Sequence, residues 1–135
     1  MKKKLDCIML IDDNEDDNFY HQIVIRDMEI TNQIKIAESG FEALEMLTKE
    51  NDAPELIFLD INMPAMNGWE FLDEYNKLSD EQKARVIIIM LTTSLNPADR
   101  HKAQKIPVVH GFETKPLTRE KLRKTIERYF PNNKK

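Results

Sequence analysis

Carboxylate, hydroxyl and ammonium side chains stand at the ends of apolar runs that lie far apart in this chain of 135 residues. If these runs are parallel strands of one sheet, their carboxyl ends share an edge, and open sheets of that kind bind ligands beyond that edge. The polar side chains would then converge on one site. The residues are Asp12, Asp13, Asp60, Thr92 and Lys115.

Three carboxylates that lie close together repel one another, so either their pKa values rise or a cation shares the site. A ligand set of oxygen atoms favours a hard cation, and Mg²⁺ is the one most available in cytoplasm. The His and Cys spacing of transition-metal sites is absent, and we expect His21, His101 and His110 to be surface or turn residues. Asp60, at the end of the third run, is the candidate nucleophile of this site.

Each of these residues also has an ordinary structural explanation when it is considered alone. An Asp at a strand end is often a turn or cap residue, and Asp12-Asp13 could form the acidic first turn of a helix. Thr92 could bond to local backbone, and Lys115 could be a solvated lysine. The convergence of all five residues on one edge of a sheet is what favours a chemical site.

Five short apolar runs are predicted to be strands, because runs that lack alternation are typical of strands covered on both faces. The second run is the weakest, since it contains Lys35. The runs are residues 5–11, 34–37, 56–59 and 86–91, and Val108-Val109 with Phe112.

Segments with helical spacing separate these runs. The first helix is expected after Asn14, with Phe19 and Ile23 at helical steps. Ser39 followed by Glu42 predicts a capping box at the start of the second helix. Further N-caps are predicted at Asn67, at Asn96 before Pro97, and at Thr118, and Pro131 is predicted to end the last helix.

Strand and helix therefore alternate five times, which predicts an α/β fold with a doubly wound, five-stranded parallel sheet and helices on both faces. The length fits one domain. We expect a single domain over residues 1–135, with an ordered core at about 4–130 and basic tails that include Lys2 to Lys4 and Lys134-Lys135.

Composition limits the partners and the location. The net charge of −4 argues against nucleic-acid binding, and no stretch approaches the roughly 20 apolar residues that a membrane span requires. Cys7 is the single cysteine, so no disulfide can form within the chain, which fits a reducing cytoplasm. We expect a cytoplasmic protein without membrane or nucleic-acid partners.

The chain resembles, nearly from end to end, the receiver domains of response regulators, which are the phosphoacceptors of two-component signalling. This resemblance implies a flavodoxin-like (βα)5 fold with the strand order 2-1-3-4-5. The residues that carry it are Asp12-Asp13, the segment Asp-Ile-Asn-Met-Pro-Ala-Met-Asn-Gly at residues 60–68, Leu91-Thr92 and Lys115-Pro116.

The resemblance also implies a mechanism. Asp60 would attack the phosphohistidine of a sensor histidine kinase or a histidine phosphotransfer protein and become a 4-aspartylphosphate. Mg²⁺ would be bound by Asp13, Asp60 and the backbone carbonyl of Asn62, with Asp12 helping through water. The domain would then not be an enzyme beyond its own phosphoryl acceptance and autodephosphorylation.

Further residues would sense the phosphoryl group. Lys115 would pair with its oxygens, and Thr92 would donate its hydroxyl to another oxygen. Because phosphorylation adds about −1.5 to −2 charges, Thr92 would move inward, and Phe112 would swing into the space behind it. Pro116 is expected after a cis peptide bond, and Gly68 is expected where a side chain would crowd the loop.

The fourth helix, fifth strand and fifth helix would form the output face, read by a downstream protein that the sequence does not identify. Residues 103–112 lack the Gly-Ala that receivers usually have after the fourth helix, and Ile106-Pro107 stands there instead. The sequence therefore does not determine the shape of this face, and it leaves two roles for Phe112, a core residue or a switch.

Two alternative functions remain open from the sequence. One is a Mg²⁺-dependent phosphohydrolase with an Asp nucleophile; such enzymes typically carry a second Asp two residues later, where this chain has Asn62. The other is a binding module that is not phosphorylated and keeps a relic pocket. The complete set of five site residues argues against that second alternative.

Overall fold

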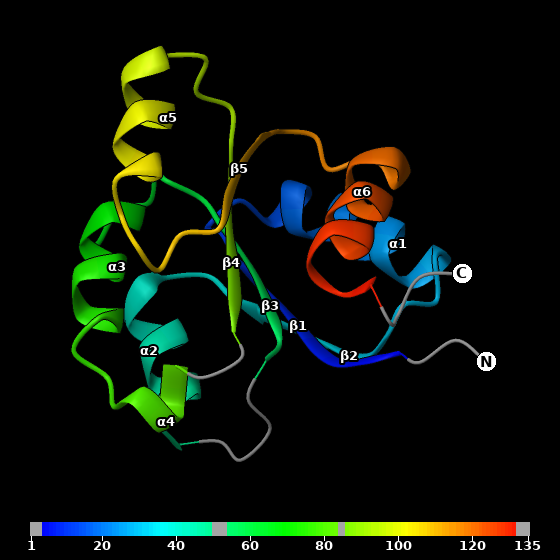
Figure 1. Cartoon of the computed structure of the whole chain (residues 1–135), viewed down its shortest axis with the longest axis horizontal. Helices are drawn as coiled ribbons and strands as arrows, with labels where there is room; N and C mark the ends of the chain where they lie inside the picture. Colours follow the sequence, from blue (N-terminus) through cyan, green and yellow to red (C-terminus); the bar gives the residue numbers. More distant parts are fainter. Residues whose placement is uncertain (1–3, 50–53, 84–85, 132–135) are drawn as a thin grey trace.

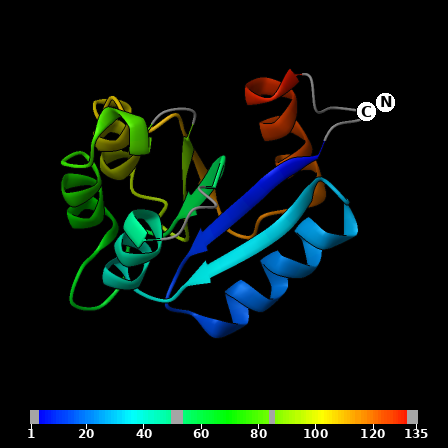
Figure 2. The same ribbon diagram turned by 90° about the horizontal axis from the view of Figure 1, so that it is seen from below.

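A five-stranded parallel sheet forms the centre of the computed structural model, which describes residues 4–49, 54–83 and 86–131. The strand order is β2-β1-β3-β4-β5, as the resemblance implied. Figure 2 shows β1 and β2 side by side and pointing the same way. The strands are β1 (Leu5–Ile11), β2 (Thr31–Ala37), β3 (Leu56–Leu59), β4 (Ile87–Thr92) and β5 (Gly111–Thr114).

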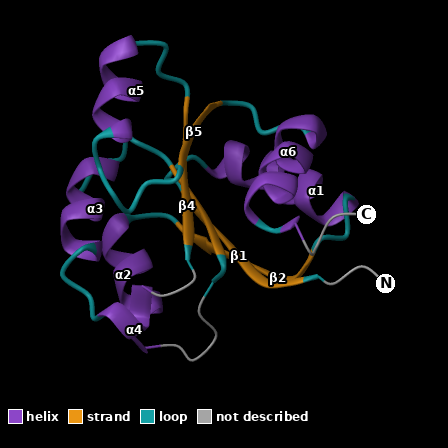
Figure 3. Ribbon diagram, viewed as in Figure 1, coloured by secondary structure: helices purple, strands orange, loops and turns teal. Residues whose placement is uncertain are grey.

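Helices cover both faces of this sheet (Figures 1 and 3). Helices α1 and α6 lie on one face, and α2, α3 and α5 lie on the other. A short helix, α4, was not predicted and lies in the connection between α3 and β4. The helices are α1 (Glu15–Asp27), α2 (Gly40–Lys49), α3 (Gly68–Tyr75), α4 (Asp80–Lys83), α5 (Pro97–Gln104) and α6 (Arg119–Tyr129).

Each face of the sheet has its own hydrophobic core. Leu10 and Phe58 pack with Ile126 in the cluster on the α1–α6 side, whereas Ile11 and Leu59 pack in the cluster on the other side. Successive residues of a strand point to opposite faces, so a strand between two cores must be apolar throughout. This arrangement explains the short apolar runs without alternation.

The predicted helix starts are confirmed at four positions. The side chains of the N-cap residues each accept a backbone N–H of the first helical turn, which satisfies a donor that has no partner within the helix. The N-caps are Asn14, Asn67, Asn96 and Thr118. Ser39 Oγ accepts the Glu42 N–H as expected, but the Glu42 carboxylate accepts the N–H of Glu38 rather than that of Ser39.

The prediction for the fifth strand is wrong at Val108-Val109. The strand begins only at Gly111. The Val109 N–H donates to the Ile106 carbonyl over 3.0 Å and closes a turn after α5. The two valines are apolar because they pack against the core from this turn, so an apolar pair here did not indicate a strand.

The expected face of the first helix is also wrong. Phe19 is 68% exposed and Ile23 is 48% exposed, whereas Asn18 and His21 are buried. The prediction that His21 is a surface or turn residue therefore fails. Both buried polar side chains form hydrogen bonds to backbone outside the helix, which is what makes their burial tolerable.

Within the described residues, no helix is both long and apolar enough to cross a membrane. Cys7 is buried, as expected for a small hydrophobic residue. The predicted basic tails at Lys2-Lys3 and Lys134-Lys135 lie outside the described residues.

Candidate functional site

The backbone hydrogen bonding of the sheet continues past the strand ends and positions the predicted site residues. The Asp12 N–H donates to Ala37 O and the Asp60 N–H donates to Ile11 O, each over 3.0 Å. The Lys115 N–H donates to Thr92 O over 2.8 Å in the same way. The residues that follow β1, β3 and β5 are thus held at one edge of the sheet.

Three carboxylates meet at this edge. Asp12, Asp13 and Asp60 each offer an oxygen, and these oxygens lie within 4.8 Å of one another. Burial first, and the charge of Asp12 second, raise the pKa of Asp60 from 3.8 to about 6. The Lys115 ammonium and two backbone N–H groups oppose this shift. An oxygen-only set whose charges repel one another fits a hard divalent cation.

Lys115 reaches into this cluster from the end of β5. Its Nζ lies 2.6 Å from Asp12 Oδ2, 2.7 Å from Asp17 Oδ2 and 3.6 Å from Asp60 Oδ2. Burial lowers the pKa of Lys115, but the hydrogen bonds and charges of these carboxylates outweigh burial and raise it above its usual value. The side chain is therefore a fixed positive charge beside Asp60.

The loops around the cluster follow the expectations. The Lys115-Pro116 peptide bond is cis. A Cβ at Gly68 would lie 2.5 Å from Asp60 O and 2.9 Å from Ile61 Cα, so a side chain at this position would collide with the backbone that carries Asp60. The Gly68 N–H donates to Ile61 O over 2.7 Å, which closes the same loop.

Thr92 and Asn62 differ in exposure. Thr92 is fully buried at the end of β4, and its Oγ1 accepts the N–H of Ser94 over 3.2 Å. Asn62 is exposed and lines an open pocket together with Asp13, Asp60, Thr93 and Lys115. The structure thus brings four predicted residues, Asp13, Asp60, Asn62 and Lys115, to one pocket. Asp12 lies beside Asp13 and Asp60, and Thr92 is buried at the end of β4 and does not line this pocket.

Sequence reasoning missed three site residues on α1: Asp17, Asn18 and His21. Asp17 is the second close partner of Lys115. Asn18 Nδ2 donates to the Asp12 carbonyl over 2.8 Å, and His21 Nε2 accepts the N–H of Leu117 over 3.2 Å, next to the cis proline. Asn18, His21 and Ile25 follow at helical steps and share the buried face of α1, but two of these three side chains are polar, so an apolar periodicity does not identify this face.

Comparisons with known proteins agree with this geometry. A family model described as the response regulator receiver domain matches residues 8–127. A chemotaxis protein CheY homolog from Campylobacter jejuni is 39% identical over 92 residues, which cover 67% of each protein. The sensor histidine kinase CheAY from Helicobacter pylori is 29% identical over 124 residues, covering 90% of this chain but 14% of that protein.

Solved structures give the same result. A two-component response regulator from Cytophaga hutchinsonii superimposes with a TM-score of 0.88 at 32% identity, covering 96% of this chain and 99% of that one. The Mn²⁺-bound form of response regulator Rcp1 superimposes with a TM-score of 0.71 at 27% identity, covering 94% of each chain. On the family match and these likenesses, the chain belongs to the response regulator receiver domain family.

Proposed function

We propose that this receiver domain accepts a phosphoryl group on Asp60 from the phosphohistidine of a sensor histidine kinase or a histidine phosphotransfer protein. The observation that carries this proposal is a buried carboxylate at the end of β3, with Asp12, Asp13 and Lys115 gathered around it. A histidine kinase among the relatives supports the donor class. We also propose a cytoplasmic location, because the phosphohistidine of such donors and free Mg²⁺ are found in the cytoplasm.

The divalent ion of the site is proposed to be Mg²⁺. Asp13, Asp60 and the backbone carbonyl of Asn62 would hold it, and Asp12 would help through water. The close approach of three carboxylate oxygens supports this site, as does the solved Mn²⁺-bound form of Rcp1. When bound, the ion would neutralise part of the charge on the carboxylates and on the incoming phosphoryl group.

Two side chains of the protein act on the phosphoryl oxygens. Lys115 supplies a positive charge, which its raised pKa keeps in place at neutral pH. Thr92 Oγ1 serves as an acceptor for Ser94, so its hydroxyl proton can be donated to a phosphoryl oxygen. Both groups stabilise the added negative charge of the phosphoryl group. This stabilisation matters because a carboxylate is a weak nucleophile, so the transfer depends on positioning and on charge neutralisation.

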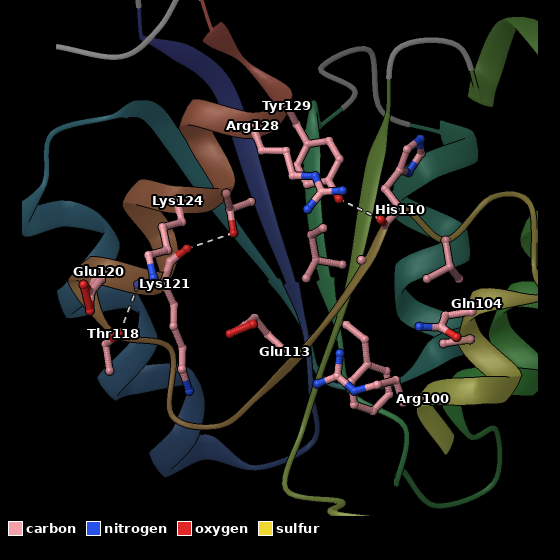
Figure 4. A pocket seen from close by; sticks show the side chains of 16 residues that line it. Arg100, Gln104, His110, Glu113, Thr118, Glu120, Lys121, Lys124, Arg128 and Tyr129 are labelled. Atoms are coloured by element: carbon pink, nitrogen blue, oxygen red, sulfur yellow. Dashed lines mark hydrogen bonds between the residues drawn. The ribbon is translucent and has the colours of Figure 1, made fainter. Parts of the chain in front are cut away.

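The readout is proposed to pass through α5, β5 and α6, the fourth and fifth major helices with the edge strand between them. A groove runs between these elements, and Figure 4 looks into it. We call it the output groove; its lining includes Arg100, Phe112, Glu113, Lys121, Lys124 and Tyr129. The Tyr129 hydroxyl donates to the His110 carbonyl over 2.7 Å and ties α6 to the segment before β5.

Phe112 is proposed as the residue that links the site to this groove. It is half-buried on β5 and pairs in register with Met90 on β4, two residues before Thr92. The Arg100 guanidinium carbon lies 4.9 Å from the centre of its ring. A shift of Thr92 toward the phosphoryl group would open space behind it, and Phe112 would move into that space and reshape the output groove.

Beryllium fluoride, an acyl-phosphate analogue, tests the proposal together with phosphotransfer from a candidate kinase. We expect analogue binding that requires Mg²⁺, and loss of both binding and phosphotransfer in Asp60→Asn. Asp73→Asn is the matched control, because Asp73 is an exposed aspartate on α3 outside the site. Phosphate uptake by Asp60→Asn at the wild-type rate would show that Asp60 is not the acceptor.

A further inference from the structure

Asp17 is a counter-ion of Lys115 that the phosphoacceptor chemistry does not require. Its Oδ2 lies 2.7 Å from Lys115 Nζ, nearly as close as Asp12 at 2.6 Å. Asp60, the proposed acceptor, is farther away at 3.6 Å, which is beyond ordinary hydrogen-bond distance. The resting position of the ammonium is therefore set by Asp12 and Asp17 rather than by Asp60.

The local structure holds Asp17 in place. Asn14 caps α1, and its Oδ1 accepts the Asp17 N–H over 3.0 Å, which fixes the backbone of Asp17 in the first helical turn. The Asp17 side chain is 34% exposed, whereas that of Lys115 is 8% exposed. Asp17 thus approaches the buried ammonium from the solvent side, and it can return to water when the contact is released.

We propose that Asp17 is a positioning residue that tethers Lys115 in the resting protein and competes with the phosphoryl group for its ammonium. This inference rests on the proposed phosphorylation of Asp60. A phosphoryl group on Asp60 draws Lys115 away from the tether, and its negative charge also repels Asp17. Both effects lower the affinity of the site for the phosphoryl group, so Asp17 sets how strongly the phosphorylated state is favoured.

The size of the effect follows from the exposure of the pair. Ion pairs with one partially exposed partner contribute modestly, because solvent screens them. We expect Asp17→Asn to tighten beryllium fluoride binding about two- to fivefold at saturating Mg²⁺. Asn keeps the size of Asp17 and removes its charge, so packing of the first turn is preserved.

Two matched variants separate the tether from other effects. Asp17→Glu keeps a carboxylate near Lys115 and is expected to bind the analogue close to wild-type affinity. Asp16→Asn removes the same charge from an exposed neighbour that lines the same pocket, and it is expected to change affinity little. Equal tightening in Asp16→Asn and Asp17→Asn would overturn the tether in favour of a general charge effect.

A second measurement uses the protein without metal or analogue. Melting of wild type, Asp17→Asn, Lys115→Met and the double variant forms a thermodynamic cycle that reports the coupling of the two side chains. We expect favourable coupling, and additive effects would overturn the tether while leaving the proposed function standing. A wild-type chain that bound no analogue with Mg²⁺ would overturn the proposed function, and with it the competition, even if the coupling were present.

Discussion

Strands β3 and β5 carry the two halves of the proposed switch, and they are packed in opposite ways. All four residues of β3 are buried, and β3 pairs with β1 and β4. All four residues of β5 are half-buried, and β5 lies at the edge of the sheet beside β4. Asp60 follows the first of these strands, and Phe112 belongs to the second.

This contrast shows how a site can be rigid while its readout moves. An acceptor carboxylate must stay within reach of Lys115 and of a bound ion, which requires a strand that cannot shift. A readout must change shape for the free energy that one phosphoryl group supplies, which requires contacts that are cheap to rearrange. Around β5 such contacts are present, because Arg100 lies over Phe112 and Arg128 lies over Tyr129 at exposed positions.

The largest expected difference is in the free energy of unfolding lost when Phe58 or Phe112 is replaced. Phe58 on β3 is 2% exposed, and Phe58→Ala should reduce the free energy of unfolding by about 3–5 kcal/mol, because it leaves a cavity in a closed core. Phe112→Ala should cost about half as much or less, because solvent already reaches this ring. Urea unfolding of both variants measures the difference.

Phe58→Leu serves as the milder variant if Phe58→Ala does not fold. Its loss should still exceed that of Phe112→Leu. Equal losses for the two leucine variants would contradict the view that β5 is the loosely packed strand, and the readout would then need a different structural origin.

The sequence predicted the fully buried strands better than it predicted the helix whose buried face is partly polar. The apolar runs predicted β1 and β3 with their bounds, because strands covered on both faces are apolar throughout. The carboxylates that follow these two strands lie together at one edge of the sheet, as expected. Periodicity failed on α1, where two buried residues are polar. The Asn18 Nδ2 donates to the backbone of Asp12 just before the helix, and His21 accepts a backbone N–H from the distant Leu117. Hydropathy reports the polarity of a side chain but not whether the fold supplies a partner for it. For the same reason the sequence did not indicate that Asp17 pairs with Lys115.

The next effect in size concerns the pH dependence of the metal-free protein. The pKa of Asp60 is about 6 in the fold, against an ordinary 3.8. The folded state therefore binds more protons between these pH values, so stability falls as pH rises from about 4 to 6. Asp60→Asn should be more stable than wild type by about 1–3 kcal/mol at pH 7 and should lose this advantage near pH 4.

Thermal melts across this pH range measure the effect. Lys115 keeps its two closer partners in Asp60→Asn, so no buried charge is left unpaired. Added Mg²⁺ should stabilise wild type much more than the variant and so reduce or reverse the order at pH 7. A constant stability difference from pH 4 to pH 7 would contradict the assignment of the raised pKa to Asp60.

The smallest effect on stability is expected for a substitution of Arg100. This substitution tests whether Arg100 holds Phe112 in its resting position or only stabilises the fold. Arg100→Gln removes the cation from the ring of Phe112 but keeps a long polar side chain, so the loss of stability should be about 0.5–1 kcal/mol. If that contact must break when Phe112 moves, the variant should bind beryllium fluoride up to about fivefold more tightly.

Lys102→Gln is the matched control, because Lys102 lies over Trp69 rather than over Phe112. A rise in affinity for Arg100→Gln alone would connect the output groove to Asp60, whereas unchanged affinity would mean that Arg100 does not hold the switch.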